Sequence, residues 1–152
     1  MDNLTHTLTG LMMSRAGLNR LSPYASAIAM VAANIPDADG VVRLGGTSLD
    51  YLDVHRGWTH TFVASPVVAA CAVGLVSLAT RRRLPWFGAW IVAWLGVLSH
   101  IVMDWSNVYG IRMLMPFRSD WLHLDVTNVV DVWIWAVLLL AVAGPLLSKP
   151  LS

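Results

Sequence analysis

Residues 84–103 read LPWFGAWIVAWLGVLSHIVM and contain a single ionisable side chain, His100. Residues 61–80 read TFVASPVVAACAVGLVSLAT and carry no charge. A helix needs about 20 apolar residues to cross the hydrocarbon core of a bilayer. The short connection between the two segments holds Arg81–Arg83. This pattern predicts a hairpin of two membrane-spanning helices with a basic turn.

Three further segments extend the pattern in both directions along the chain. A third span covers roughly residues 127–147, interrupted by Asp131. Residues 3–14 and 23–35 are apolar but shorter, so they form either a tilted hairpin or helices that pack against the spans without crossing. We therefore expect one all-α domain over residues 1–152, an integral membrane bundle of about five helices.

The composition supports a lipid environment and excludes several classes of function. Of the 152 residues, 57% are hydrophobic and 12% are charged, whereas a soluble domain carries about 25% charged residues. A net charge of +1 offers no basic surface for nucleic acid. The single cysteine, Cys71, excludes an internal disulfide and a thiolate metal cluster.

The ionisable residues sort to the two ends of the expected helices. If five helices cross in alternation, one end holds Arg15, Arg20, Arg81–Arg83 and Lys149, and the other holds His6, Asp37, Asp39, His60, His100, Asp104 and Asp131. The positive-inside rule places the arginine end in the cytoplasm, although Arg43, Arg56, Arg112 and Arg118 weaken the charge bias. We expect a multi-pass protein whose His/Asp end faces outward.

His100 and Asp104 are four residues apart and therefore share one face of a helix. An imidazole and a carboxylate in this position can bind one metal ion. They can equally form a hydrogen bond that holds two helices together. Ionisable groups inside a membrane span are costly unless they are paired or coordinated, so both interpretations give the pair a role.

Two polar connections contribute further candidates. Asp37 and Asp39 occur in N-I-P-D-A-D-G, where two carboxylates can bind a cation or cap a turn. His55 and His60 flank Arg56 in H-R-G-W-T-H, and the planar guanidinium of Arg56 suits an oxyanion. The same stretch between residues 37 and 60 also holds two more acids, Asp50 and Asp53.

The available ligand atoms limit the chemistry. His6 gains weight because it falls at the same end as the other histidines, and Asp131 is a ligand, a partner of a ligating histidine or a helix contact. Imidazole and carboxylate ligands suit zinc, with manganese or iron(II) as alternatives. All nine acidic residues are aspartates, so a general base is an Asp, a His or metal-activated water.

The order of these motifs resembles a known family. MDNLTHTLTG, NIPDAD, HRGWTHT and SHIVMDWSNVYGIR follow one another across residues 1–112. Together they resemble the YdjM-like family of bacterial inner-membrane proteins, which are described as metal-dependent hydrolases. That family is distantly similar to the all-helical zinc-dependent phospholipase C and P1 nuclease group, whose members hydrolyse phosphate esters.

The resemblance implies roles for individual residues. His6 resembles a histidine that serves one metal, Asp37 or Asp39 resembles a loop aspartate that serves another, and His60 resembles the histidine that follows it. His100 and Asp104 resemble a helix pair whose carboxylate bridges metals. The soluble enzymes use a Glu for a further zinc, and this chain has no Glu.

We therefore expect a hydrolase of the bacterial inner membrane that cleaves a phosphoester of a lipid or lipid-linked head group by metal-activated water. The expected metal ligands are His6, Asp37, Asp39, His55, His60, His100 and Asp104. Asp37 and Asp104 would be catalytic, and Arg56 and Arg112 would bind the oxyanion. The expected partners are membrane lipid and this substrate, without nucleic acid; the oligomeric state stays open. Two rival interpretations are a metal or proton transport path and a purely structural metal site.

Overall fold

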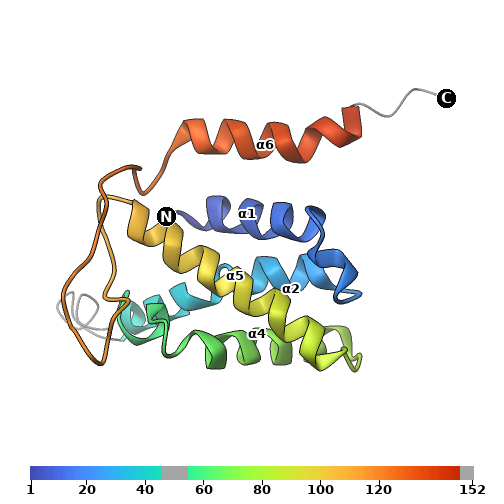
Figure 1. Ribbon diagram of the computed structural model, residues 1–152, viewed down its shortest axis with the longest axis horizontal. Helices are drawn as coiled ribbons and strands as arrows, with labels where there is room; N and C mark the ends of the chain where they lie inside the picture. Colours follow the sequence, from blue (N-terminus) through green and yellow to red (C-terminus); the bar gives the residue numbers. More distant parts are fainter. Residues whose placement is uncertain (46–54, 148–152) are drawn as a thin grey trace.

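All the extended regular elements in the described part of the chain are helices. The computed structural model describes residues 1–45 and 55–147, with side chains outside 42–44 and 145–147. Its α-helices are α1 (Asn3–Arg15), α2 (Ala25–Ala32), α4 (Ser65–Thr80), α5 (Trp86–Ser106) and α6 (Val132–Leu147) (Figure 1). Three 3-10 segments are η1 (Leu18–Arg20), η2 (Ile35–Leu44) and η3 (Trp58–His60). Within these residues only isolated β-bridges occur, so the expected all-α class is confirmed.

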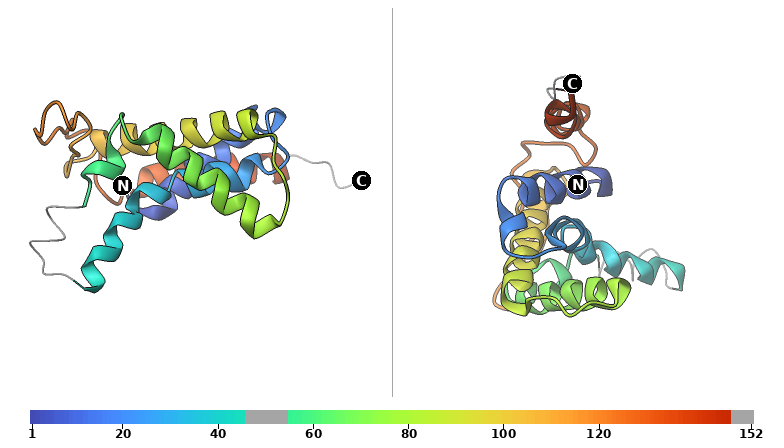
Figure 2. Two further views of the ribbon diagram at one scale, coloured as in Figure 1. Left: turned by 90° about the horizontal axis from the view of Figure 1, so that it is seen from below. Right: turned by 90° about the vertical axis from the view of Figure 1, so that its right-hand side faces the viewer.

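The five α-helices run along the long axis of an elongated bundle. Seen end-on, α6 lies on α1, α1 lies on α2, and α4 and α5 complete the opposite side, while η2 projects away from the bundle (Figure 2). The segments 55–64 and 107–131 lie at one end, and the turns 16–24 and 81–85 lie at the other (Figure 1). We call these the site end and the arginine end.

One described helix, α5, has the length and composition to cross a membrane. The apolar helices α4 and α6 are shorter, with 16 residues each, and both begin later than the apolar runs predict. The start of α6 has a clear physical cause, because Asp131 Oδ1 accepts hydrogen bonds from the N–H groups of Trp133 (3.0 Å) and Ile134 (3.3 Å). Asp131 is thus a helix cap. The multi-pass arrangement stays a prediction.

Small residues let three helices approach closely at the centre of the bundle. A Cβ added to Gly10 of α1 would lie 2.6 Å from the carbonyl oxygen of Ala29 in α2. A Cβ added to Gly96 of α5 would lie 3.0 Å from Ala32 Cβ and 3.1 Å from the same Ala29 oxygen. Glycine and alanine at helix contacts are typical of packing inside membranes. Helix α2 is therefore clamped between α1 and α5.

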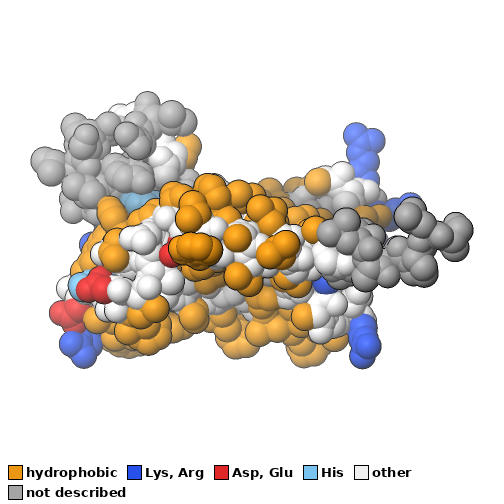
Figure 3. Space-filling view, turned by 90° about the horizontal axis from the view of Figure 1, so that it is seen from above, with side chains coloured by type: hydrophobic (Ala, Val, Ile, Leu, Met, Phe, Trp, Pro, Cys, Tyr) orange, Lys and Arg blue, Asp and Glu red, His pale blue; other side chains and the backbone are white. Residues whose placement is uncertain are grey.

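The outer surface of the bundle is apolar between its two ends. Figure 3 shows hydrophobic side chains along the middle, with histidine, acidic and basic groups at the site end and basic groups alone at the arginine end. Large apolar side chains are exposed on four of the described helices, among them Leu4 of α1, Leu78 of α4, Phe87 of α5 and Leu140 of α6. A continuous apolar surface of this kind marks contact with lipid or with another protein.

Candidate metal centre

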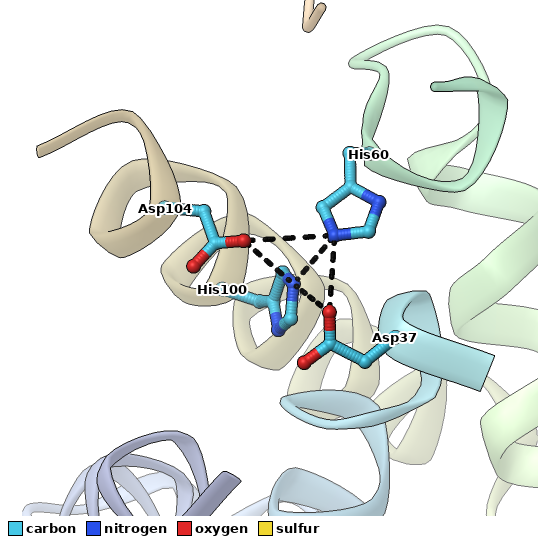
Figure 4. Close-up of side chains that lie close together, drawn as sticks. All are labelled: Asp37, His60, His100 and Asp104. Carbon is cyan, nitrogen blue, oxygen red and sulfur yellow. Dashed lines mark hydrogen bonds and ion pairs between the residues drawn. The ribbon is translucent and has the colours of Figure 1, made fainter. Parts of the chain in front are cut away.

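Four ionisable side chains converge at the site end of the bundle. Asp37 comes from η2, His60 from η3, and His100 and Asp104 from α5, and all four point toward one another (Figure 4). One ligand atom from each lies within 4.8 Å of the others. His60, His100 and Asp104 have no exposed surface. Such burial of charged or polar groups is costly unless they are paired or coordinate a cation.

Five of the six donor–donor distances are close to those around a small tetrahedral ion, and the sixth, between Asp37 and Asp104, lies within 4.8 Å. His60 Nε2 lies 3.0 Å from His100 Nε2, 3.3 Å from Asp37 Oδ1 and 3.6 Å from Asp104 Oδ2. His100 Nε2 lies 3.7 Å from Asp37 Oδ1 and 3.6 Å from Asp104 Oδ2. Zinc binds imidazole and carboxylate at about 2.0–2.2 Å, which separates neighbouring tetrahedral ligands by about 3.3–3.6 Å. The four donors therefore surround a space of the right size.

The backbone at the end of α2 fixes the orientation of His100. His100 Nδ1 lies 2.7 Å from the carbonyl oxygen of Ala33. A carbonyl only accepts, so the proton is on Nδ1 and the lone pair of Nε2 faces the cluster. The contact depends on Gly96, one helical turn earlier in α5, which brings this face of α5 against α2.

Asp39 fixes the orientation of His60 from outside the cluster. Its Oδ2 lies 3.4 Å from His60 Nδ1 and accepts hydrogen bonds from Thr59 Oγ1 (2.6 Å) and the Arg56 N–H (3.1 Å). Its Oδ1 lies 2.8 Å from His55 Nδ1. A carboxylate that accepts the second N–H of a ligating histidine is a common feature of metal sites.

The two carboxylates of η2, Asp37 in the cluster and Asp39 outside it, stay ionised. Burial raises the pKa of Asp39, but hydrogen bonds from His55, His60 and Thr59 outweigh burial and hold the pKa well below its usual range. For Asp37, burial also acts to raise the pKa, while the hydrogen bond and charge of His60 lower it overall. Both side chains therefore carry a negative charge at neutral pH, and that of Asp37 favours a cation between it and the two histidines.

The Nε2 atoms of His60 and His100 face each other at 3.0 Å, a distance at which they share either a proton or a metal ion. His100 directs Nδ1–H to the Ala33 carbonyl oxygen. His60 Nδ1 lies 3.0 Å from Thr59 Oγ1, whose hydroxyl donates to Asp39, so both Nε2 atoms present lone pairs to the cluster when the two imidazoles are neutral. Lone pairs repel at this distance, and Asp104 Oδ2 adds a third donor atom without a hydrogen bond among the described residues. The donor set thus fits a divalent metal such as zinc.

His6 of α1 lies on the far side of Asp104. Its ring stacks on that of His100 with centroids 3.9 Å apart, and its Nε2 lies 3.3 Å from Asp104 Oδ1. Neither ring nitrogen makes a hydrogen bond within the described residues, although the side chain is fully buried. The amino group of Met1 also contacts Asp104 Oδ1. Asp104 therefore directs Oδ2 toward His60 and His100 and Oδ1 toward His6 and Met1.

A buried arginine stands at the edge of the cluster. Arg56 Nη2 lies 3.3 Å from Asp104 Oδ2, and Nη1 donates to the carbonyl oxygen of Gly110 at 3.1 Å. Its guanidinium lies over the Tyr109 ring, 4.4 Å from the centroid. A cavity of about 410 Å³ opens here, with Asp37, His55 and Arg56 in its wall. The cavity gives a ligand access to both Asp37 and Arg56.

The structure separates the expected ligands into groups. It brings Asp37, His60, His100 and Asp104 together, places His6 beside Asp104, and places Asp39 and His55 one layer further out. Arg112 lies over the Trp121 ring at 5.2 Å, and its backbone N–H donates to the Arg56 carbonyl oxygen (3.2 Å). Asp50, Asp53 and Lys149 lie outside the described residues.

Three groups that hold the cluster residues in place were not predicted from the sequence. Asn107 Nδ2 donates to Asp104 Oδ1 at 3.3 Å, and Asn107 Oδ1 lies 3.4 Å from Arg56 Nη1. Thr59 binds Asp39, and the Ala33 carbonyl oxygen binds His100. The spacing of Asn107, three residues after Asp104 on one helical face, was a usable signal; a backbone carbonyl leaves none in the sequence.

Fold and centre together define a helical membrane protein with a buried His/Asp cluster suited to a divalent metal. The sequence model of the YdjM inner membrane protein family matches residues 1–151, so the chain belongs to that family. The chain is also 28% identical over 153 residues to uncharacterized protein YfhP of Bacillus subtilis (strain 168). That alignment covers 94% of this chain but only 46% of the relative. No solved structure matches the chain significantly.

Proposed function

We propose that the protein is a metal-dependent hydrolase of the inner membrane that cleaves a phosphoester of a lipid or lipid-linked head group. The observation that carries the proposal is the convergence of two histidine Nε2 atoms, 3.0 Å apart, with two carboxylates. Both histidines are oriented through Nδ1, which is how ligating histidines are held. A polar cavity next to the cluster supports catalysis over a purely structural role.

Asp37, His60, His100 and Asp104 would hold a divalent metal, for which zinc fits the donor set best. A bound metal of this kind acts as a Lewis acid and lowers the pKa of water to about 7. His6 and the second oxygen of Asp104 would serve a further ion, consistent with a carboxylate that faces both sides. Asp39 and His55 would hold His60 in position from outside.

The substrate phosphate would bind in the cavity of about 410 Å³. This volume lies in the range of small-molecule sites, about 300–1,000 Å³. Arg56 would bind the phosphate oxygens, because its planar guanidinium is fixed by Gly110 and Tyr109 and pairs with oxyanions in two-point contacts. Arg112, whose backbone binds that of Arg56, would support the same oxyanion.

The membrane arrangement follows from the charges at the two ends. The described arginine end carries Arg15, Arg20 and Arg81–Arg83 and has no acidic residue. Such an end faces the cytoplasm under the positive-inside rule. The protein would then cross the membrane several times and present the metal centre on the extracytoplasmic face, where lipid head groups are within reach.

The test compares metal content and hydrolysis in wild-type protein and a His100→Ala, Asp104→Ala double variant, purified in detergent without chelator. The matched control is His123→Ala, Asp125→Ala, which removes an exposed His–Asp pair with a 2.9 Å contact at the same end. We expect stoichiometric metal and release of phosphorylated head group from phospholipid in the wild type and control, and neither in the double variant.

Each contrary outcome would favour a different interpretation of the His/Asp cluster. Folded wild-type protein without metal would refute the metal centre. Metal that is required for folding, with no turnover of any phospholipid or phosphoester, would identify a structural site. Metal-dependent ion flux into proteoliposomes without hydrolysis would identify a transporter.

A further inference from the structure

Apolar side chains continue beyond the helix ends at the site end of the bundle. The loops there expose large apolar groups, with 83% of Phe117 and 73% of Val126 accessible. We call the following exposed residues the apolar collar: Phe62, Val63, Phe117, Leu124, Val126 and Val130. Members of the collar lie just before α4, just before α6 and beside the end of α5, so the collar extends the apolar surface of these helices.

The collar lies at the level of the metal centre along the bundle. The Leu124 N–H donates to the carbonyl oxygen of Trp105 at 2.9 Å, and Trp105 directly follows Asp104 in α5. Phe62 follows His60 by two residues. Because the collar is fixed next to two of the four cluster residues, the depth of the collar in a membrane is also the depth of the metal centre.

The exposed charges at the two ends differ in their partners. At the site end, Arg118 Nε lies 2.7 Å from Asp120 Oδ2, and His123 Nδ1 lies 2.9 Å from Asp125 Oδ1. The described residues of the arginine end include no acidic side chain, and basic side chains project from that end (Figure 3). An arginine without an acidic partner is costly inside a membrane, so the arginine end stays at the head-group level. Paired charges beside exposed apolar groups let the site end enter the interface at lower cost.

The lengths of the helices require a contribution from the collar. Helices α4 and α6 have 16 residues each, which is about 24 Å at 1.5 Å per residue, whereas the hydrocarbon core is about 30 Å thick. Helix α5, with 21 residues, matches the core and ends at the collar. The bilayer either thins around the short helices or is met by apolar groups beyond their ends. Since the arginine end carries the charges without acidic partners, the collar supplies the missing length.

We propose that the apolar collar lies in the leaflet at the site end, in contact with the glycerol groups and first acyl carbons of phospholipids. The metal centre then lies at the depth of the lipid phosphate groups, and a lipid of the same leaflet reaches it from within the membrane plane. A lipid surface is favoured over a protein partner because the collar continues the apolar surface of a chain from an inner-membrane family. The inference rests on the membrane arrangement proposed above and does not depend on hydrolysis.

The test measures how fast a negatively charged maleimide labels single cysteines of the full-length protein in nanodiscs of phosphatidylcholine with long acyl chains. The native Cys71, exposed near the middle of α4, reports whether the bundle crosses the bilayer. In a Cys71→Ala chain, Val126→Cys reports on the collar, and Arg118→Cys is a control of similar exposure in the same loop. Each rate is divided by the rate in denaturant, which removes differences in thiol reactivity.

We expect Cys71 to stay unlabelled, and Val126→Cys to react at least about tenfold more slowly than Arg118→Cys, because a charged reagent is excluded from the apolar part of the membrane. In nanodiscs with shorter acyl chains, the Val126→Cys rate should rise toward that of Arg118→Cys while Cys71 stays protected. This dependence on bilayer thickness distinguishes cover by lipid from cover by protein.

Three results would contradict the proposal. Equal rates for Val126→Cys and Arg118→Cys in long-chain lipid, with Cys71 protected, would overturn the position of the collar and leave the membrane arrangement intact. A slow Val126→Cys rate that does not change with chain length would show that protein covers the collar, which also overturns the proposal. Rapid labelling of Cys71 would overturn the membrane arrangement and the collar with it.

Discussion

The two ends of the bundle use charge in opposite ways. At the site end, His6, His60, His100 and Asp104 are fully buried and lie in contact with one another. At the arginine end, Arg15, Arg20 and Arg81–Arg83 are exposed. Buried ionisable groups persist only where a partner or cation compensates them, whereas exposed ones keep their hydration. The comparison teaches that the site end gathers its ionisable groups in a buried cluster that could hold a cation, whereas the arginine end keeps its charges separate and solvated.

The largest effect should come from removing the ligand at the centre of the cluster. His60→Gln replaces the Nε2 atom that lies within 3.6 Å of the other three donors. We expect metal affinity to fall by about 100-fold or more, since loss of an outer partner alone costs 10–100-fold. Competition with a zinc chelator measures the effect, and Arg82→Gln at the arginine end serves as the control. Unchanged affinity would show that the cluster is not the metal centre.

Asp39→Asn removes a charge from outside the cluster and should have the next largest effect. Asparagine keeps the shape but loses the carboxylate that holds His60 and His55. We expect metal affinity to fall about 10- to 100-fold with the fold retained. Asp125→Asn alters an exposed carboxylate that binds His123 and should leave metal affinity unchanged. Equal metal affinity in the two variants would show that Asp39 does not support the metal centre.

Gly10→Ala and Gly96→Ala affect the core shared by both ends. Each new methyl group would meet α2 at 3.1 Å or less, so the helices must separate. We expect the free energy of unfolding to fall by about 1–3 kcal/mol. Gly74→Ala in α4, where a Cβ meets nothing within 4 Å, should gain about 0.5–1 kcal/mol from helix propensity. Denaturation in detergent distinguishes the three, and a stable Gly10→Ala protein would contradict the close packing.

The smallest effect should follow from Arg15→Ala at the arginine end. Arg15 Nη1 donates to the Val142 carbonyl oxygen at 3.1 Å from an exposed position. Exposed contacts of this kind contribute less than about 1 kcal/mol. We expect Tm to change little and metal content to stay as in the wild type. A loss of metal in this variant would mean that the two ends are coupled through α6.

The sequence predicted the existence of the helices more accurately than it predicted their first residues. Long apolar runs located α4, α5 and α6, because a helix in lipid must be apolar on most of its surface. The starts of α4 and α6 were missed because local groups decide them. Residues 61–64 form a turn in which the Ala64 N–H donates to Thr61 Oγ1 at 3.0 Å, and the Asp131 carboxylate fixes the first turn of α6. The pair His100 and Asp104 was predictable from helical spacing alone.

The different positions of Asp37 and Asp39 were not predictable from the D-x-D pattern. The segment winds as the 3-10 helix η2, in which two residues separated by one other point about 120° apart, at three residues per turn. Asp37 therefore faces His60 Nε2, and Asp39 faces His60 Nδ1 and His55. On a loop the same two carboxylates could chelate one ion together, and nothing in the residues themselves distinguishes the two geometries.

The tight contacts of Gly10 and Gly96 with α2 lead to a rule for finding such a centre in other chains. His6 precedes Gly10 by four residues, and His100 follows Gly96 by four. The order is reversed because α1 runs away from the site end and α5 runs toward it (Figure 1). A single inserted residue between glycine and histidine would turn the imidazole by about 100°. Chains that keep His-x-x-x-Gly in a departing helix and Gly-x-x-x-His in a returning one therefore keep the stacked imidazoles of His6 and His100 in place, while Asp37 and His60 depend on η2 and η3.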